Sequence, residues 1–155
     1  MICKNGIVIE PYRDELDDVL DIENACFTDP WTKEMFIGAI GGEYTYFTLA
    51  RDSGKICGYL LALIYPPEAE IMSIAVHPDC MGKGIGAALI TEFISQSEAR
   101  GSEAIYLEVR KSNERALRLY NKFDFVPVGI RKNYYSNPRE DAIVMVRQRP
   151  QNRGN

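Results

Sequence analysis

One segment, Ile74 to Leu89, constrains the fold more than any other part of the chain. It begins as an apolar run typical of a buried strand, continues with glycines at 82, 84 and 86, and ends in the apolar pattern of a helix. Glycines let a backbone approach a ligand closely, and a helix N-terminus offers free N–H groups and the positive end of its dipole. The segment therefore predicts a phosphate-binding turn, although a glycine-rich turn that only joins strand to helix has the same pattern.

The same glycines allow a second interpretation. Gly82-x-Gly84-x-x-Ala87 fits the dinucleotide-binding fingerprint, and Glu108 follows about 20 residues later, where a ribose ligand is expected. That fingerprint normally begins a doubly wound parallel sheet, whereas here about 75 residues precede it and one crossover unit follows. A dinucleotide-binding oxidoreductase stays open as an alternative.

Apolar periodicity and turn residues predict the order of the elements. Residues 44–76 contain three consecutive strands of an antiparallel meander, and a strand, helix and strand over 68–109 form a parallel crossover. We expect an α/β (α+β) fold, a central mixed and mostly antiparallel seven-stranded sheet with four helices on its faces. The strands are expected at 7–12, 44–50, 55–65, 68–76, 104–109, 125–130 and 142–146, and the helices at 14–26, 32–40, 85–100 and 113–122.

Length and composition bound the organisation of the chain. With 155 residues, 46% of them hydrophobic, there is room for one domain, which we expect over residues 1–147, with a disordered tail at 148–155. The net charge is −4, whereas nucleic-acid-binding domains are usually strongly basic, so we expect no nucleic-acid partner. No targeting segment or membrane-length apolar run is seen, which predicts a cytoplasmic protein without a membrane partner.

The metal-ligating residue types are sparse and scattered. The four cysteines show no Cys-x-x-Cys spacing, and His77 is the single histidine. We expect neither a bound metal nor a disulfide framework. His77 precedes Pro78 and is interpreted as a loop residue outside the site.

Several motifs together resemble a known family. Ile74-Ala-Val-x-Pro-x-x-x-x-x-Gly84-x-Gly86 resembles the acetyl-CoA motif of the GNAT superfamily, and 107–113 and 116–125 resemble its continuation. Segments 27–32, 130–135 and 140–145 are similar to the bacterial ribosomal-protein-alanine N-acetyltransferases (RimI type) and the archaeal N-terminal acetyltransferases. The chain departs from the superfamily pattern at Met81, usually Gln or Arg, and at Asp124, usually Gly.

The resemblance implies a GNAT fold with acetyl-CoA as cosubstrate. It assigns the backbone of Ile74, Ala75 and Val76 to the pantetheine arm and acetyl group, and it assigns Asn113 to a contact with CoA. Taken without the resemblance, the first three are core strand residues and Asn113 is a helix N-cap. The pyrophosphate is assigned to the turn and the start of the helix, namely Gly82, Lys83, Gly84, Ile85, Gly86 and Ala87.

The resemblance also implies the catalytic pair. Glu108 matches the general base, acting directly or through a water, and Tyr120 matches the general acid that assists the departing thiolate. From pattern alone, Glu108 belongs to a solvated strand face and Tyr120 to the core. The acceptor is expected to enter between two aromatic connections, which contain Phe27, Trp31, Tyr134 and Tyr135.

The resemblance implies an enzyme that acetylates the α-amine at a protein or peptide N-terminus, as at the alanine end of ribosomal protein S18, by direct attack on the thioester. An α-amine with a pKa near 8 is easier for one carboxylate to deprotonate than a lysine near 10.4. Three alternatives stay open: a small-molecule amine acceptor, a CoA-binding module without turnover, and the dinucleotide oxidoreductase. A monomer or weak dimer is expected.

Overall fold

The computed structural model describes residues 2–151 and shows one mixed sheet of eight strands in the order β1-β2-β3-β4-β5-β6-β8-β7. Only β5 and β6 pair in parallel, and all other neighbours are antiparallel. The strands are β1 (Ile2–Lys4), β2 (Ile7–Pro11), β3 (Thr45–Asp52), β4 (Lys55–Tyr65), β5 (Glu68–Val76), β6 (Ala104–Arg110), β7 (Val126–Tyr135) and β8 (Glu140–Gln148). The predicted mixed sheet is confirmed, with the short β1 added at one edge.

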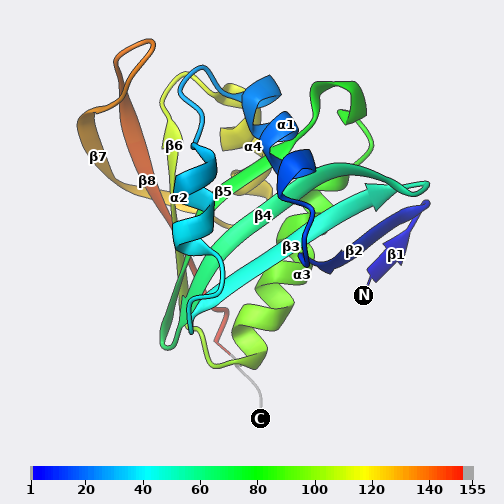
Figure 1. The fold of residues 1–155 in the computed structure, drawn as a ribbon. Coiled ribbons are helices and arrows are strands. Elements are labelled where there is room, and N and C mark those ends of the chain that lie inside the picture. The colour runs from blue at the N-terminus through cyan, green and yellow to red at the C-terminus, as the bar shows by residue number, and fades with distance from the viewer. Residues whose placement is uncertain (1, 152–155) are drawn as a thin grey trace.

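Four α-helices cover the two faces of the sheet (Figure 1). Helices α1 (Leu16–Cys26) and α2 (Lys33–Ala39) pack on one face, around the fully buried Phe36 and Tyr59. Helices α3 (Ile85–Ala99) and α4 (Glu114–Lys122) pack on the other, where Phe93 and Phe125 are fully buried. The sheet is therefore buried on both sides, as its near-continuous apolar strands require.

The predicted helix boundaries are supported by capping contacts. The Thr32 side chain accepts a hydrogen bond from the Met35 N–H at 3.2 Å, and Asn113 Oδ1 accepts from the Ala116 N–H at 3.1 Å. Gly101, with φ of 99°, follows the end of α3. Each contact satisfies backbone groups that the helix itself leaves unpaired.

The β7–β8 hairpin differs from the prediction. The expected strands 125–130 and 142–146 are longer, and only residues 136–139 connect them. Tyr134 and Tyr135 therefore lie at the end of β7, and the prediction that they lie in a connection is wrong. β7 is an exposed edge strand paired to β8 alone, with irregular register between Arg131 and Tyr135. Its apolar alternation ends at Ile130, because Lys132 follows, and so the pattern could not reveal the full length of the strand.

The end of the chain follows β8 closely. Gln148, the first residue of the predicted tail, is the last residue of β8, and the Arg149 N–H donates to the Glu103 carbonyl at 2.7 Å. The prediction of disorder for residues 152–155 lies outside the described residues.

The sheet opens between β5 and β6. Their ladder joins only Glu68–Glu70 to Ala104–Tyr106, after which the two strands diverge. Beyond this point β5 stays paired with β4 through an irregular register near Leu61, and β6 stays paired with β8. The divergence leaves backbone and side chains of both strands facing a gap in the middle of the sheet.

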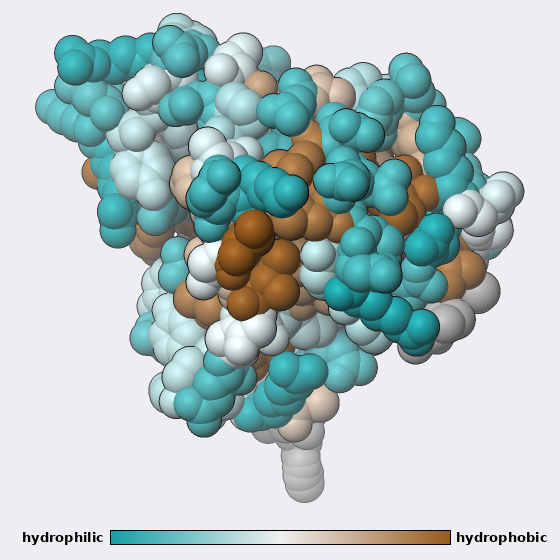
Figure 2. Space-filling view, viewed as in Figure 1, coloured by the Kyte–Doolittle hydropathy of each residue, from teal (hydrophilic) through white to brown (hydrophobic). Residues whose placement is uncertain are grey.

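The surface facing the viewer is mainly hydrophilic, with an apolar patch over α2 (Figure 2). Met35 and Ile37 of α2 are 49% and 54% exposed, whereas Phe36 is fully buried. This seven-residue helix is thus anchored to the sheet through one aromatic side chain. Within residues 2–151, no helix has the length and apolar character needed to cross a membrane.

Candidate active site

Two adjoining cavities lie along the part of β5 that has diverged from β6. The first, which we name the hairpin cavity, has a volume of about 480 Å³ and extends from α1 and β5 to β6 and the β7–β8 hairpin. The second, the glycine cavity, has a volume of about 540 Å³ and lies between β5, the glycine turn and α4. The two share wall residues and therefore meet at Cys26, Phe27, Ile74, Asn113, Ala116 and Tyr120.

The glycine cavity is built to receive an anion. Gly82 and Gly84 have φ of 83° and 79°, and Gly84 is the N-cap of α3. A Cβ at either position would meet nothing within 4 Å, so the backbone conformation rather than lack of space requires glycine. The N-terminus of α3 directs its free N–H groups toward this cavity, and Arg115, Arg118 and Lys122 of α4 add positive charge to the wall.

Glu108 lies in the wall of the hairpin cavity, on β6 between the buried Leu107 and Val109. Its Oε1 is 3.6 Å from Arg131 Nε, and its Oε2 is buried with no hydrogen-bond partner among the described residues. A buried carboxylate oxygen without a partner is costly, so it marks a place where a ligand donor or proton can be accepted.

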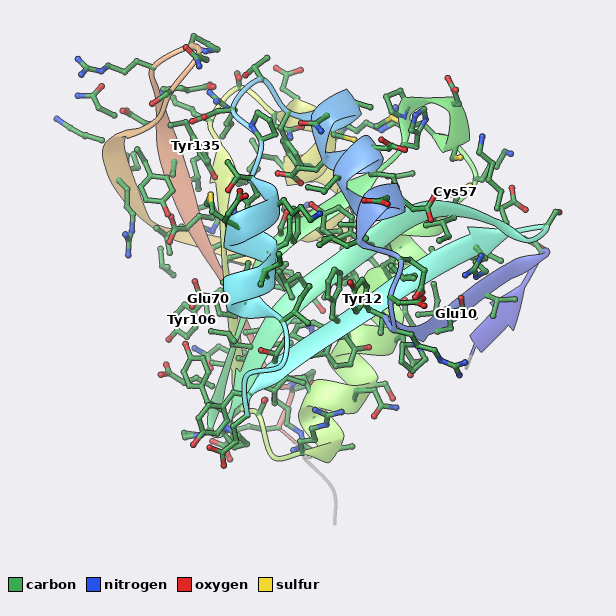
Figure 3. All side chains as sticks on the ribbon, viewed as in Figure 1. Glu10, Tyr12, Cys57, Glu70, Tyr106 and Tyr135 are labelled. Carbon is green, nitrogen blue, oxygen red and sulfur yellow. The ribbon has the colours of Figure 1, made fainter. Side chains whose placement is uncertain are left out.

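Tyr135 forms part of the same wall, at the end of the molecule where the β7–β8 hairpin stands (Figure 3). Burial raises the pKa of its phenol to about 12, and the charge of Glu108 adds to this effect. Tyr135 therefore stays neutral at physiological pH and can offer a hydroxyl to the cavity.

Tyr120 of α4 lies at the junction of the two cavities and is 6% exposed. Its ring centre is 5.9 Å from that of Phe125, and burial raises the pKa of the phenol well above its ordinary value. The phenol is thus a proton carrier and hydrogen-bond donor throughout the range in which the protein works.

Besides the Tyr120 hydroxyl, the Cys26 thiol lies at the junction of the two cavities. Its Sγ donates to the Val76 carbonyl at 3.1 Å, and burial raises the pKa of the thiol to about 11. Because the thiolate is the nucleophilic form, this cysteine is poorly suited to form an acyl intermediate.

The structure brings together most of the residues expected in the site, with two exceptions. The Lys83 ammonium points away from the glycine cavity and lies 3.0 Å from Asp52 Oδ2. Tyr134 is 49% exposed and is not part of the hairpin cavity wall, but its ring lies against Tyr135, and burial together with the nearby Glu108 carboxylate raises the pKa of its phenol. The expected residues that line one or both cavities are Phe27, Trp31, Ile74, Ala75, Val76, Gly82, Gly84, Ile85, Gly86, Ala87, Glu108, Asn113, Tyr120 and Tyr135.

Sequence reasoning missed several wall residues. Arg110 could have been found, because strand alternation places it on the same face of β6 as Glu108. Glu23 could also have been noticed, since it lies four residues after the inward-facing Val19. The basic residues of α4 recur at helical spacing, but nothing local shows which cavity they face. Within the described residues, no group of three or more His, Cys, Asp or Glu side chains is placed to hold a metal ion.

Comparison with known proteins agrees with this geometry. The ribosomal protein bS18-alanine N-acetyltransferase of Escherichia coli strain K12 is 36% identical over 133 residues, which cover 84% of this chain and 89% of that protein. The corresponding enzyme of Haemophilus ducreyi is 32% identical over 134 residues, covering 84% and 92%. The crystal structure of the Escherichia coli ribosomal-protein-S18-alanine N-acetyltransferase matches with a TM-score of 0.86 at 30% identity, covering 96% of this chain and 99% of that one.

The splayed sheet, the glycine-capped helix and these similarities define an acyltransferase. Residues 16–125 match the acetyltransferase (GNAT) family, and the chain belongs to it. Acetyltransferases of this family use acetyl-CoA. The dinucleotide interpretation finds no support, because the sheet is antiparallel except at β5–β6.

Proposed function

We propose that this acetyltransferase transfers the acetyl group of acetyl-CoA to the α-amine at a protein N-terminus, with the alanine end of ribosomal protein bS18 as the acceptor. The observation that carries this proposal is the position of Glu108. Glu108 lines the hairpin cavity, which meets the glycine cavity at Tyr120, and its buried Oε2 has no hydrogen-bond partner among the described residues. The names of relatives that are 32–36% identical over most of the chain indicate the acceptor. A ribosomal-protein acceptor implies action in the cytoplasm.

The glycine cavity is proposed to hold CoA. The N–H groups at the turn and the first turn of α3 would bind the pyrophosphate, and the backbone of Ile74 to Val76 would direct the pantetheine arm along β5 toward Tyr120. Arg115, Arg118 and Lys122 supply charge for the remaining phosphate. Lys83 would contribute through its backbone N–H only, since its ammonium is paired with Asp52.

The hairpin cavity is proposed to hold the acceptor amine. Glu108 takes a proton from the ammonium, and the free amine attacks the thioester carbonyl carbon directly. The new C–N bond forms as the C–S bond breaks, and the Tyr120 hydroxyl donates to the departing sulfur. Glu108 passes the first proton to solvent and then takes the second proton from the nitrogen, while the sulfur takes the Tyr120 proton and CoA leaves as the thiol. Glu108 releases its second proton to solvent and Tyr120 regains one from solvent, so each turnover releases one proton.

An α-amine suits this cavity better than a lysine side chain does. Its pKa near 8 lies closer to that of a carboxylate than the lysine value near 10.4, so the proton transfer costs about 3 kcal/mol less. Trp31 and Phe27 line one side of the cavity and Tyr135 lines another, which leaves aromatic walls for a small first side chain.

Mass spectrometry of N-terminal peptides incubated with the protein and acetyl-CoA tests the proposal. A peptide with the bS18 N-terminal alanine is expected to gain one acetyl group, and the same peptide with a chemically blocked α-amine is expected to gain none. Transfer to internal lysines of the blocked peptide at an undiminished rate would reject the N-terminal acceptor. Turnover with small amines alone would favour a small-molecule acetyltransferase, and acetyl-CoA binding without any turnover would favour a binding module.

A further inference from the structure

A second carboxylate, Glu23, lies in the wall of the hairpin cavity and is unused by the proposed mechanism. It is on α1, only 2% exposed, and burial raises the pKa of its carboxyl. Carboxylates are rarely buried to this degree unless they are paired or hydrogen-bonded. The hydrogen-bond partners of the Glu23 carboxylate therefore indicate its role in the structure.

Both carboxylate oxygens of Glu23 are occupied by donors from other elements. Oε2 accepts the Trp31 backbone N–H at 2.8 Å, and Oε1 accepts the hydroxyl of the fully buried Tyr59 on β4. The Tyr59 hydroxyl is also 2.7 Å from Ser73 Oγ, and either atom can be the donor. A continuous polar chain thus connects the α1–α2 connection to β5, on which the acetyl group is proposed to lie.

This arrangement contrasts with that of Glu108. Within residues 2–151 the Oε2 of Glu108 has no hydrogen-bond partner, whereas each oxygen of Glu23 already has a donor. A carboxylate with a donor already held on each oxygen is less suited to take a proton from an amine than one with a partnerless oxygen, but it is well placed to hold those two donors. The two carboxylates of the cavity therefore have different tasks.

We propose that Glu23 is a positioning residue for the acceptor: it fixes the Phe27–Trp31 wall of the hairpin cavity against β4 and β5. Phe27 and Trp31 lie on the connection between α1 and α2, and Trp31 packs on Phe36 with ring centres 5.2 Å apart. The Glu23 contact is the polar attachment of this connection to the sheet. The inference rests on the proposed function, because it assigns this wall to the acceptor.

Two substitutions separate positioning by hydrogen bonds from recognition by charge. In Glu23→Gln, the amide oxygen can accept the Trp31 N–H while the amide NH₂ donates to Tyr59, whose own hydroxyl then donates to Ser73. Positioning survives although the charge is lost. In Glu23→Asp, the charge remains, but the side chain is one methylene shorter and cannot reach both donors. Positioning by hydrogen bonds therefore predicts that Glu23→Gln is more active than Glu23→Asp, and recognition by charge predicts the reverse order.

Steady-state kinetics with the bS18 N-terminal peptide and acetyl-CoA provide the test. We expect Glu23→Gln to keep the acceptor KM within about 3-fold of wild type, and Glu23→Asp to raise it about 10-fold or more with kcat changed less. Asp21→Asn, on the exposed side of the same helix, is the matched control and should change nothing. A damaging Glu23→Gln beside a harmless Glu23→Asp, or an unchanged acceptor KM in both, would overturn the proposal.

A second measurement does not depend on the acceptor. Trp31 is the single tryptophan of the chain, so its fluorescence reports on this wall alone. In Glu23→Asp its emission should shift to the red and quenching by acrylamide should rise about 2-fold, with no such change in Glu23→Gln or Asp21→Asn. Unchanged fluorescence in Glu23→Asp would overturn the anchoring role. If the fluorescence changes as expected while wild type fails to acetylate N-termini, the proposed function fails and the anchoring role stands.

Discussion

The Arg110 guanidinium lies over the ring of Tyr135, 4.6 Å from its centre, and so joins β6 to the hairpin that closes the proposed acceptor site. The same guanidinium donates to the Ser136 carbonyl and, at 2.9 Å, to the Pro138 carbonyl, and it pairs with Glu140 at 3.2 Å. Arg110 is two residues beyond Glu108 on the same face of β6. The β6–β8 ladder sets the register of the hairpin, and the Arg110 side chain attaches the turn end of the hairpin to the catalytic strand.

Arg110→Lys is expected to loosen this attachment. An ammonium is a point charge that cannot reproduce the planar fork on two carbonyls and a carboxylate while lying on a ring. We expect the acceptor KM to rise about 10-fold and the melting temperature to fall by a few degrees, with acetyl-CoA affinity unchanged. Arg139→Lys, on the exposed turn of the same hairpin, is the control. Equal KM values in the two variants would contradict the role of Arg110.

Alkylation of Cys26 should be slow and strongly dependent on pH. A thiol with a pKa raised to about 11 has roughly 100-fold less thiolate at pH 8 than one at the ordinary value of 9.0. We expect its reaction with iodoacetamide, followed by peptide mass spectrometry, to accelerate about tenfold per pH unit toward pH 11. The raised pKa favours the folded state below pH 9, and this contribution is lost as the pH rises through about 11. Rapid labelling at pH 7 would contradict this account.

Acetyl-CoA should stabilise the protein. At about 100 times Kd, binding to the folded state adds about 2.7 kcal/mol, which for a chain of this size raises the melting temperature by roughly 5–10 °C. NAD at the same concentration should produce no comparable shift. Stabilisation by NAD and not by acetyl-CoA would show that the glycine cavity holds a different ligand.

The features that were predictable from sequence depend on neighbours in the chain. The caps at Thr32 and Asn113 involve donors three residues away, and the orientation of Glu108 follows from strand alternation. The glycine turn was recognisable because its positive φ angles restrict the residue type.

The features that were missed depend on distant partners. Helical spacing places Glu23 on the inner side of α1, but its hydrogen-bond partner Tyr59 is 36 positions further on, so the role of this carboxylate could not be seen from its neighbours in the chain. Lys83 was assigned to the cradle from its place in the glycine turn, but Asp52, 31 positions earlier, holds its ammonium elsewhere. The full length of β7 could not be predicted, because this exposed edge strand is defined by its backbone pairing with β8 and not by a pattern of buried side chains.

Glu108→Gln is expected to slow turnover at pH 7 by roughly 10²–10⁴-fold with little change in acetyl-CoA affinity. The amide cannot take the ammonium proton, but an acceptor amine with a pKa near 8 is mostly deprotonated in solution above about pH 9. The defect in kcat/KM should therefore shrink as the pH rises from 7 to 9.5. A folded Glu108→Gln protein with unchanged turnover at pH 7 would show that Glu108 is an ordinary strand residue without a catalytic role.

Tyr120→Phe should slow turnover by a similar factor but respond differently to pH. The substitution keeps the ring beside Phe125 and removes only the hydroxyl, so folding and acetyl-CoA binding should change little, and both are measured first. The lost hydrogen bond strengthens as negative charge builds on the departing sulfur, which makes its effect largest in the transition state.

Alkali cannot replace this donor, because raising the pH only deprotonates the amine and supplies no proton to the sulfur. Burial raises the pKa of Tyr120, so the wild-type phenol stays protonated through pH 9.5, and the ratio of wild-type to Tyr120→Phe activity should stay nearly constant over the range in which the Glu108→Gln defect shrinks. Parallel pH profiles of kcat/KM for the two variants test this difference. If both defects shrank together at high pH, Tyr120 would be acting through the deprotonation of the amine and not on the leaving thiolate.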